Sequence, residues 1–171
     1  MDRRALLKAA GAVVGAGLVW SALCAQLAAK GEVPSGPSPL PVEVVDWYAA
    51  QAKWVVPVLV AQWGFMAWVA QGAAEKTAGQ GTFAATAAGI GVGWGLPLGL
   101  ALFVELVVYT VAGMEGLRSG LPLVAPLALA GCLYGTARGL KQAHGFGWEK
   151  AAPIALLALM LGAVLGGPFL R

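Results

Sequence analysis

The sequence predicts an all-α polytopic membrane helix bundle with five transmembrane helices, a cytoplasmic N-terminus and an external C-terminus. Three observations favour this fold. The chain of 171 residues is 59% hydrophobic and only 11% charged, whereas soluble domains carry about 25% charged residues. Several stretches of about 20 residues contain no charged side chain, as transmembrane helices require. These stretches are continuous apolar runs rather than alternating patterns, so a membrane β-barrel is disfavoured.

Five segments of one predicted membrane domain, residues 1–171, are long and apolar enough to be spans. They are residues 9–29, 54–74, 83–113, 119–138 and 151–170. The third segment is uncharged to residue 104 and then continues past Glu105 to about Gly113. Helices are expected because they satisfy every backbone hydrogen bond within one segment in lipid.

The distribution of Lys and Arg predicts the orientation of these spans. Cytoplasmic loops of membrane proteins carry an excess of Lys and Arg. With the N-terminus inside, seven of the eleven basic residues lie on the cytoplasmic side and four lie outside. The inner set is Arg3, Arg4, Lys8, Lys76, Arg138, Lys141 and Lys150, and the outer set is Lys30, Lys53, Arg118 and Arg171.

The first span has features of both an anchor and an export signal. Arg3 and Arg4 precede an apolar stretch, which resembles a twin-arginine signal. The stretch is longer than the usual 7–15 apolar residues of a cleaved signal. A small-x-small cleavage site is not clear near residues 27–29. We therefore expect residues 9–29 to be retained as a transmembrane helix.

An external loop, residues 30–53, separates the first two spans. Its first part contains Pro34, Pro37, Pro39 and Pro41, which favour an extended linker because proline fixes φ and lacks an amide donor. Its second part, residues 42–53, has two open interpretations. It is either a short amphipathic helix on the membrane surface or an extension of the second span.

Glycines recur at every fourth position in several spans. This spacing lets helix backbones approach closely in membranes. It predicts packing inside the bundle, with contact to another chain as the alternative. The packing glycines are Gly91, Gly95, Gly99, Gly131, Gly135, Gly139, Gly162 and Gly166. Gly11 and Gly15 form a further pair in the first span.

Glu105 is the charged residue embedded in an apolar span. A charge at the bilayer centre costs about 3 kcal/mol on insertion scales, so such residues are functional candidates by default. Glu105 is a candidate for carrying protons or binding a cation. The alternative is a structural carboxyl that accepts a hydrogen bond from Tyr109, one helical turn further on.

His144, Arg138 and Lys141 form a second group of candidates. They lie in a short cytoplasmic stretch, residues 138–150, before the last span. His144 is the single histidine of the chain, so a histidine pair for haem or a histidine-rich zinc site is excluded. The basic residues suit anionic lipid headgroups.

The sequence predicts neither an enzyme nor a cofactor. It has no glycine-rich phosphate loop, no paired carboxylates and no serine–histidine–aspartate set. Cys24 and Cys132 lie inside apolar segments and are expected to be small buried hydrophobic residues.

The net charge of +3 is small and the basic residues are scattered, so nucleic acid is excluded as a partner. Membrane lipids, other membrane proteins or a second copy are the expected partners.

Two expected cytoplasmic stretches carry distinctive short motifs. Residues 78–86 read Ala-Gly-Gln-Gly-Thr-Phe-Ala-Ala-Thr, and residues 139–145 read Gly-Leu-Lys-Gln-Ala-His-Gly. The chain thereby resembles the YIP-domain family of Ypt-interacting membrane proteins, in its bacterial form. The first stretch is similar to the Gly-Gly-x-Gly-Thr-Phe-x-x-Thr that often precedes the third span of that family, and the second is similar to the motif before its last span. Trp63 and Pro97 also stand where the family tends to have these residues.

The resemblance covers residues 54–170 and implies five spans, a cytoplasmic N-terminus and a role as a membrane adaptor or organiser. It implies no reaction. Two other functions remain open from the residues alone. One is a small accessory subunit of a larger respiratory, photosynthetic or transport complex, and the other is a small transporter that uses Glu105. High Ala, Gly and Leu content without asparagine is typical of a GC-rich bacterium, so we expect the inner (cell) membrane.

Overall fold

The protein is an all-α bundle in the computed structural model, which describes residues 3–34 and 42–169. Its helices are α1 (Arg3–Ala29), α2 (Trp47–Lys76), α3 (Phe83–His144) and α4 (Trp148–Gly166), with a short 3₁₀ turn η1 (Val44–Asp46) before α2. Within the described ranges there is no β-strand. All four helices are long and apolar enough to cross a membrane, as a multi-pass membrane protein requires.

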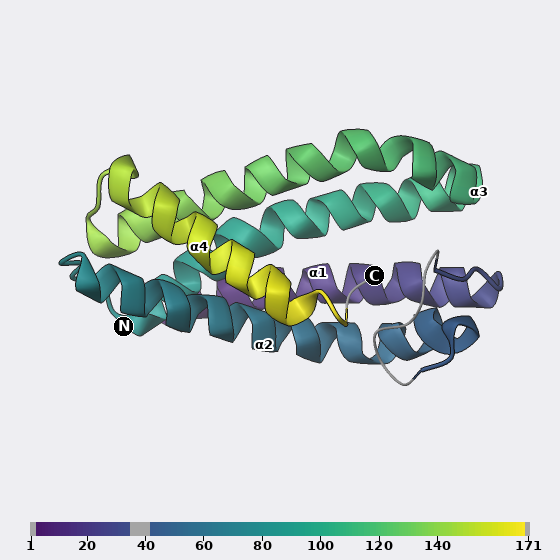
Figure 1. Ribbon diagram of the computed structural model, residues 1–171, viewed down its shortest axis with the longest axis horizontal. Helices are drawn as coiled ribbons and strands as arrows, with labels where there is room; N and C mark the ends of the chain where they lie inside the picture. The colour runs from purple at the N-terminus through teal and green to yellow at the C-terminus, as the bar shows by residue number, and fades with distance from the viewer. Residues whose placement is uncertain (1–2, 35–41, 170–171) are drawn as a thin grey trace.

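Helix α3 is folded back on itself at Gly113. Gly113 has φ 67° and ψ −159°, a backbone conformation that glycine adopts far more readily than other residues. Figure 1 shows the two arms of α3, residues 83–112 and 114–144, running side by side in opposite directions. The bend therefore turns one long helix into a hairpin of two helical arms.

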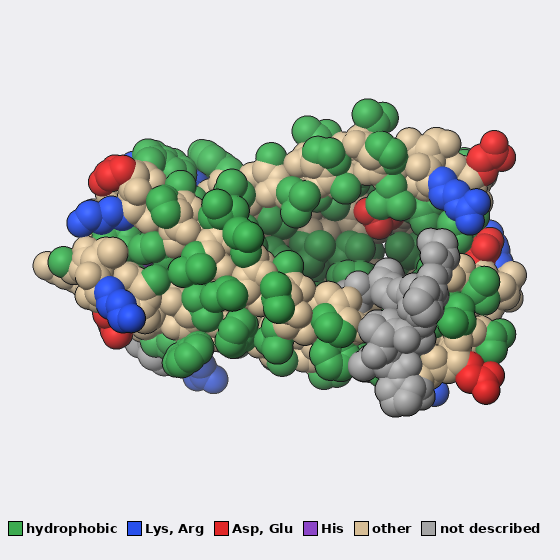
Figure 2. Space-filling view, viewed as in Figure 1, with side chains coloured by type: hydrophobic (Ala, Val, Ile, Leu, Met, Phe, Trp, Pro, Cys, Tyr) green, Lys and Arg blue, Asp and Glu red, His purple; other side chains and the backbone are tan. Residues whose placement is uncertain are grey.

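The connections gather at the two ends of the bundle. In Figure 1 the N-terminus, the α2–α3 connection and the α3–α4 connection lie at one end, which we call the His144 end. The bend of α3, the end of α1 and the start of α2 lie at the other, the Gly113 end. Figure 2 shows hydrophobic side chains over the middle of the molecule and charged side chains gathered toward both ends. This distribution is the one expected for helices that cross an apolar layer.

The two arms of α3 touch through glycine backbone. A Cβ built at Gly89 or Gly93 would meet the backbone of Gly139 or Gly135, respectively, on the opposite arm. The first arm also packs on α1, where a Cβ at Gly95 would lie 3.0 Å from Ala12. These close approaches are possible because glycine has no side chain.

The other regularly spaced glycines of α3 and α4 pack against side chains of several different segments. A Cβ at Gly91 would lie 2.7 Å from Ala9 and one at Gly99 would lie 3.3 Å from Ala16, both on α1; at Gly131 it would lie 3.1 Å from Pro97; at Gly162 and Gly166 it would meet Met66 and Gln62 of α2 at 2.6 and 2.7 Å. Gly11 and Gly15 face open space, with no atom within 4 Å of an added Cβ. The same four-residue spacing therefore brings glycines of α3 and α4 against a neighbouring helix or arm, whereas in α1 it leaves Gly11 and Gly15 without a close neighbour.

Polar side chains join the helices inside the bundle. Gln62 Nε2 of α2 donates to the carbonyl of Gly162 on α4 at 2.9 Å. Trp63 Nε1 of α2 donates to the carbonyl of Ala87 on α3 at 2.8 Å. Such bonds satisfy groups that would otherwise be stranded in an apolar interior. They fix the register of α2 against α3 and α4.

The observed helices extend beyond the expected ranges, and two of these differences change the interpretation of a connecting segment. Helix α2 begins at Trp47, so most of residues 42–53 extends the second helix rather than forming a separate surface helix. The expected connection at residues 114–118 is helical, and the chain reverses at Gly113 instead. One positive-φ glycine makes this reversal, so a polar loop is not needed there.

Candidate functional site

The most organised polar cluster of the bundle surrounds His144 at the His144 end. His144 is the last residue of α3 and is only 6% exposed. The sequence predicted that His144 lies in the loop of residues 138–150, and this loop position is wrong. Helix α3 continues to residue 144, so the connection to α4 consists only of residues 145–147. Gly145 ends α3 with φ 69°, the left-handed position that glycine favours after a helix.

The imidazole of His144 bonds to residues from the start of α3 and the turn before it. The backbone N–H of Gly81 donates to His144 Nδ1 at 3.0 Å, across 63 residues of sequence. His144 Nε2 lies 2.8 Å from the hydroxyl of Thr86. One ring therefore connects the end of α3 with its beginning.

Gln71 of α2 completes the cluster. The Thr86 hydroxyl lies 2.6 Å from Gln71 Oε1, closer than the 3.2 Å to the carbonyl of Thr82. Gln71 Nε2 in turn donates to the carbonyl of Gly81 at 3.1 Å. Gln71, Gly81, Thr86 and His144 thus form a closed circuit of hydrogen bonds, which we call the polar ring.

The polar ring determines which nitrogen of His144 carries the hydrogen. A backbone N–H can only donate, so Nδ1 must accept from Gly81. Nε2 then carries the hydrogen of the neutral imidazole and donates to Thr86, whose hydroxyl donates to Gln71 Oε1. Every member is satisfied in this arrangement, which fits a neutral histidine with a structural role.

The glycines of the turn are required by these side chains. A Cβ at Gly81 would lie 2.7 Å from His144 Nδ1, and a Cβ at Gly79 would lie 2.6 Å from the ring of Phe146. Phe146 stacks on His144 with ring centroids 5.1 Å apart and an interplanar angle of 14°. The turn before α3 must therefore be glycine-rich for the histidine to approach its backbone.

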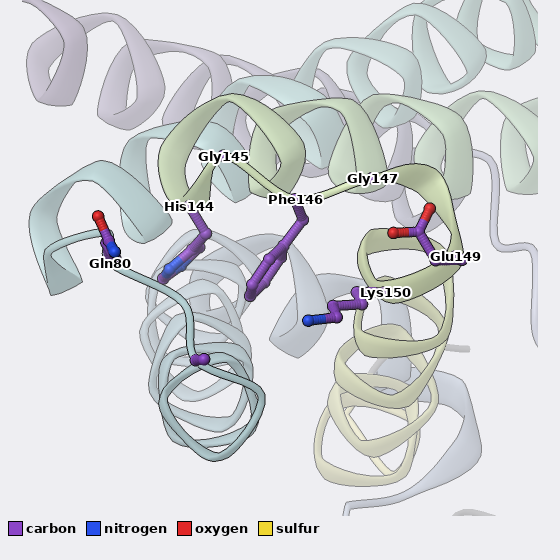
Figure 3. A pocket seen from close by; sticks show the side chains of 8 residues that line it. Gln80, His144, Gly145, Phe146, Gly147, Glu149 and Lys150 are labelled. Carbon is purple, nitrogen blue, oxygen red and sulfur yellow. The ribbon is translucent and has the colours of Figure 1, made fainter.

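A cavity of about 440 Å³ opens beside this stack. Figure 3 shows the rings of His144 and Phe146 side by side, with Gln80 beyond the histidine and Lys150 beyond Phe146. Lys150 Nζ lies 5.8 Å from the centre of the Phe146 ring and donates to the carbonyl of Thr77 at 3.2 Å. The cavity is small and open, and His144, Phe146 and Lys150 on its border already have partners.

Arg138 and Lys141 do not join the polar ring. Lys141 Nζ lies 5.2 Å from the centre of the Trp148 ring, a favourable cation–π geometry. Trp148 also stacks on Tyr134, with centroids 5.5 Å apart. Arg138 is exposed and lines a second, larger cavity between α1 and α3. The three candidates therefore lie in three different surroundings: His144 in the polar ring, Lys141 over Trp148, and Arg138 at the larger cavity.

Glu105 and Tyr109 lie toward the Gly113 end and do not bond to each other. Tyr109 is fully buried, and its hydroxyl has no hydrogen-bond partner among the described residues. The hydrogen bond from Tyr109 to Glu105, which the sequence offered as one alternative, is therefore not formed. The reason is packing: Tyr109 is buried with Leu23 and Leu27 of α1, while Lys30 Nζ lies 4.5 Å from the centre of its ring.

The members of the polar ring bond to one another, as the members of a structural polar cluster do. Among the described residues, no three His, Cys, Asp or Glu side chains come together as a metal site would require. Cys24 and Cys132 are both free and buried. Sequence reasoning missed Gln71, and its signal was an amide side chain inside an apolar span, where Gln62 is the other amide.

Comparisons of this chain with protein-family models, with curated proteins and with solved structures give no match.

Proposed function

We propose that the chain is a YIP-like integral membrane protein that acts as a non-enzymatic adaptor or organiser through protein and lipid contacts. The observation that carries the proposal is the polar ring. The two stretches that resemble YIP-domain motifs, residues 78–86 and 139–145, are far apart in sequence but are joined in the fold by His144, Gly81 and Thr86. Motif residues that bond to one another support a common origin better than two isolated matches do.

The proposed topology has five membrane crossings, because each arm of α3 counts as one. The arm of residues 83–112 is about 45 Å long at 1.5 Å per residue, and a bilayer core is about 30 Å thick. The arm of residues 114–144 has a similar length. The seven basic residues expected on the inside lie in the segments that meet at the His144 end, which supports a cytoplasmic position for that end.

This orientation predicts the reactivity of introduced cysteines in intact cells. In a chain whose Cys24 and Cys132 are replaced by alanine, Lys141→Cys is expected to resist a membrane-impermeant thiol reagent. Glu43→Cys, exposed before α2, is expected to react. Both should react once the cells are permeabilised. Labelling at position 141 in intact cells would refute the cytoplasmic orientation.

An adaptor role predicts how the protein behaves on extraction from its native membrane. In mild detergent it is expected to run alone, or as a homo-oligomer with lipid, and to retain other membrane proteins only when they are cross-linked before extraction. Native mass and subunit composition measure this, with an equally tagged unrelated multi-pass protein as the control. Recovery in fixed ratio with larger subunits would instead make the chain an accessory subunit of that complex.

A further inference from the structure

A large groove lies between α1 and the two arms of α3 at the His144 end. Its volume is about 1190 Å³. Apolar and small side chains make up most of its lining, and Phe83, Leu96 and Tyr134 are 49%, 58% and 56% exposed. No member of the polar ring lines this groove, although Thr82 and Ala143, the sequence neighbours of Gly81 and His144, do. The groove is therefore a separate feature of the fold.

The glycine crossing of α3 gives the groove its shape. The arms touch through Gly89, Gly93, Gly135 and Gly139, and these same residues line the groove. Its length follows from the lining between Phe83 and Pro97, which is about 21 Å at 1.5 Å per residue. One leaflet of a bilayer provides about 15 Å of hydrocarbon. The groove is thus long enough for an acyl chain that enters from the membrane.

The charges of the groove have one sign. Among the residues that the structure describes, Lys8 and Arg138 are the charged ones in the lining, and no carboxylate is among them. Both side chains are exposed, and within residues 3–34 and 42–169 neither has an ion-pair partner. Gln142 and Thr82 add hydrogen-bonding groups to the lining. Two free cations above an apolar groove are complementary to an anionic head that carries a hydrocarbon tail.

We propose that this groove binds one anionic phospholipid from the membrane, with its phosphate held by Lys8 and Arg138 and one acyl chain lying along the arms of α3. Arg is suited to phosphate because its planar fork donates two parallel hydrogen bonds. A parallel second copy fits less well, because it would bring its own Lys8 and Arg138 to the same depth of the membrane. The inference rests on the proposed membrane orientation and gives the proposed lipid contact a specific place.

The test measures lipid retention by the full-length protein. Purified protein is equilibrated with mixed micelles that contain equal amounts of phosphatidylglycerol and phosphatidylcholine with identical acyl chains, and native mass spectrometry counts the bound lipids. One phosphatidylglycerol is expected to be retained about tenfold better than phosphatidylcholine, a ratio typical of two partly exposed charge contacts. Equal retention of the two lipids would overturn the proposal.

Two variants test the two parts of the groove. The double variant Lys8→Gln/Arg138→Gln is expected to lose the preference for phosphatidylglycerol. Val92→Phe, which places a larger side chain in the apolar lining, is expected to weaken retention of both lipids. The matched control is Lys76→Gln/Lys150→Gln, which removes two charges outside the groove lining and should retain the preference. An equal loss in the control would show general attraction to the basic surface and would refute the site.

The remaining outcomes separate this inference from the proposed function. Lipid-free dimers, or a partner helix cross-linked to Leu96→Cys, would show another occupant and would overturn the lipid site alone. The lipid measurement uses isolated protein, so stoichiometric association with a larger complex would refute the adaptor role and leave the lipid site standing. Solubility without detergent would refute both.

Discussion

Replacing Gly93 with alanine is expected to destabilise the bundle by about 3 kcal/mol or more, the upper range for added methyl groups in a packed core. The added Cβ would meet the backbone carbonyl of Gly135 and would lie 2.6 Å from the backbone nitrogen of Thr136. Backbone cannot rotate away as a flexible side chain can, so the two arms of α3 must separate. Unfolding in mixed detergent, followed by the fluorescence of the seven tryptophans, measures the loss.

Gly15→Ala is the matched control for this substitution. Gly15 is also inside a helix, but nothing lies within 4 Å of an added Cβ. Alanine is favoured over glycine in a helix by about 1 kcal/mol, so this variant is expected to be as stable as the natural chain or more so. If Gly93→Ala and Gly15→Ala had the same effect, the close crossing of the arms would be wrong.

A second alanine at the same crossing should cost less than the first. Gly135→Ala places its methyl group against Gly93 from the other arm. Once one methyl group has separated the arms, the other finds more room, so the double variant is expected to lose less stability than the two single variants together. Fully additive losses would show that the two glycines pack independently.

The glycine pattern shows how far the fold could be predicted from the sequence. Repeats of four residues in the third and fourth predicted spans indicated close packing, but spacing does not name the partner of each glycine. Gly11 and Gly15 have the same spacing and face open space. The partner depends on how the arms of α3 are rotated, and that rotation is set by contacts across the whole bundle. The reversal at Gly113 was likewise hidden, because a single positive-φ glycine leaves no polar loop in the sequence.

The candidate site was less predictable than the helices. His144 stood out as the single histidine of the chain, and the sequence placed it in a short cytoplasmic loop, residues 138–150. Its burial depends on Gly81 and Thr86, which are 63 and 58 residues away in sequence. Patterns within a short stretch of sequence cannot predict contacts between residues so far apart. Only the family resemblance singled out both stretches. Gln71 had no such mark, although a polar amide within an apolar helix needs a partner and is a signal in itself.

His144→Phe is expected to destabilise the His144 end while leaving its packing largely intact. A phenyl ring can keep the stack on Phe146, but it cannot accept from the Gly81 amide or donate to the Thr86 hydroxyl. Each buried group left without a partner costs on the order of 1–3 kcal/mol. Lower stability, together with faster hydrogen exchange at the Gly81 amide, is the expected result. Gln80→Ala, exposed at the same cavity, is the control and should change stability by less than about 0.5 kcal/mol.

A double-mutant cycle with Thr86→Val decides whether the polar ring acts as one unit. Valine has nearly the shape of threonine but removes the hydroxyl that lies 2.8 Å from His144 and 2.6 Å from Gln71. If the ring is cooperative, breaking one hydrogen bond weakens the others. The double variant should then lose about 0.5–3 kcal/mol less stability than the sum of the two single variants. Losses that simply add would mean that His144 and Thr86 are stabilised separately. In that case the hydrogen bonds between residues 78–86 and 139–145 would not act as a unit. The polar ring would then no longer support the proposal of a YIP-like protein.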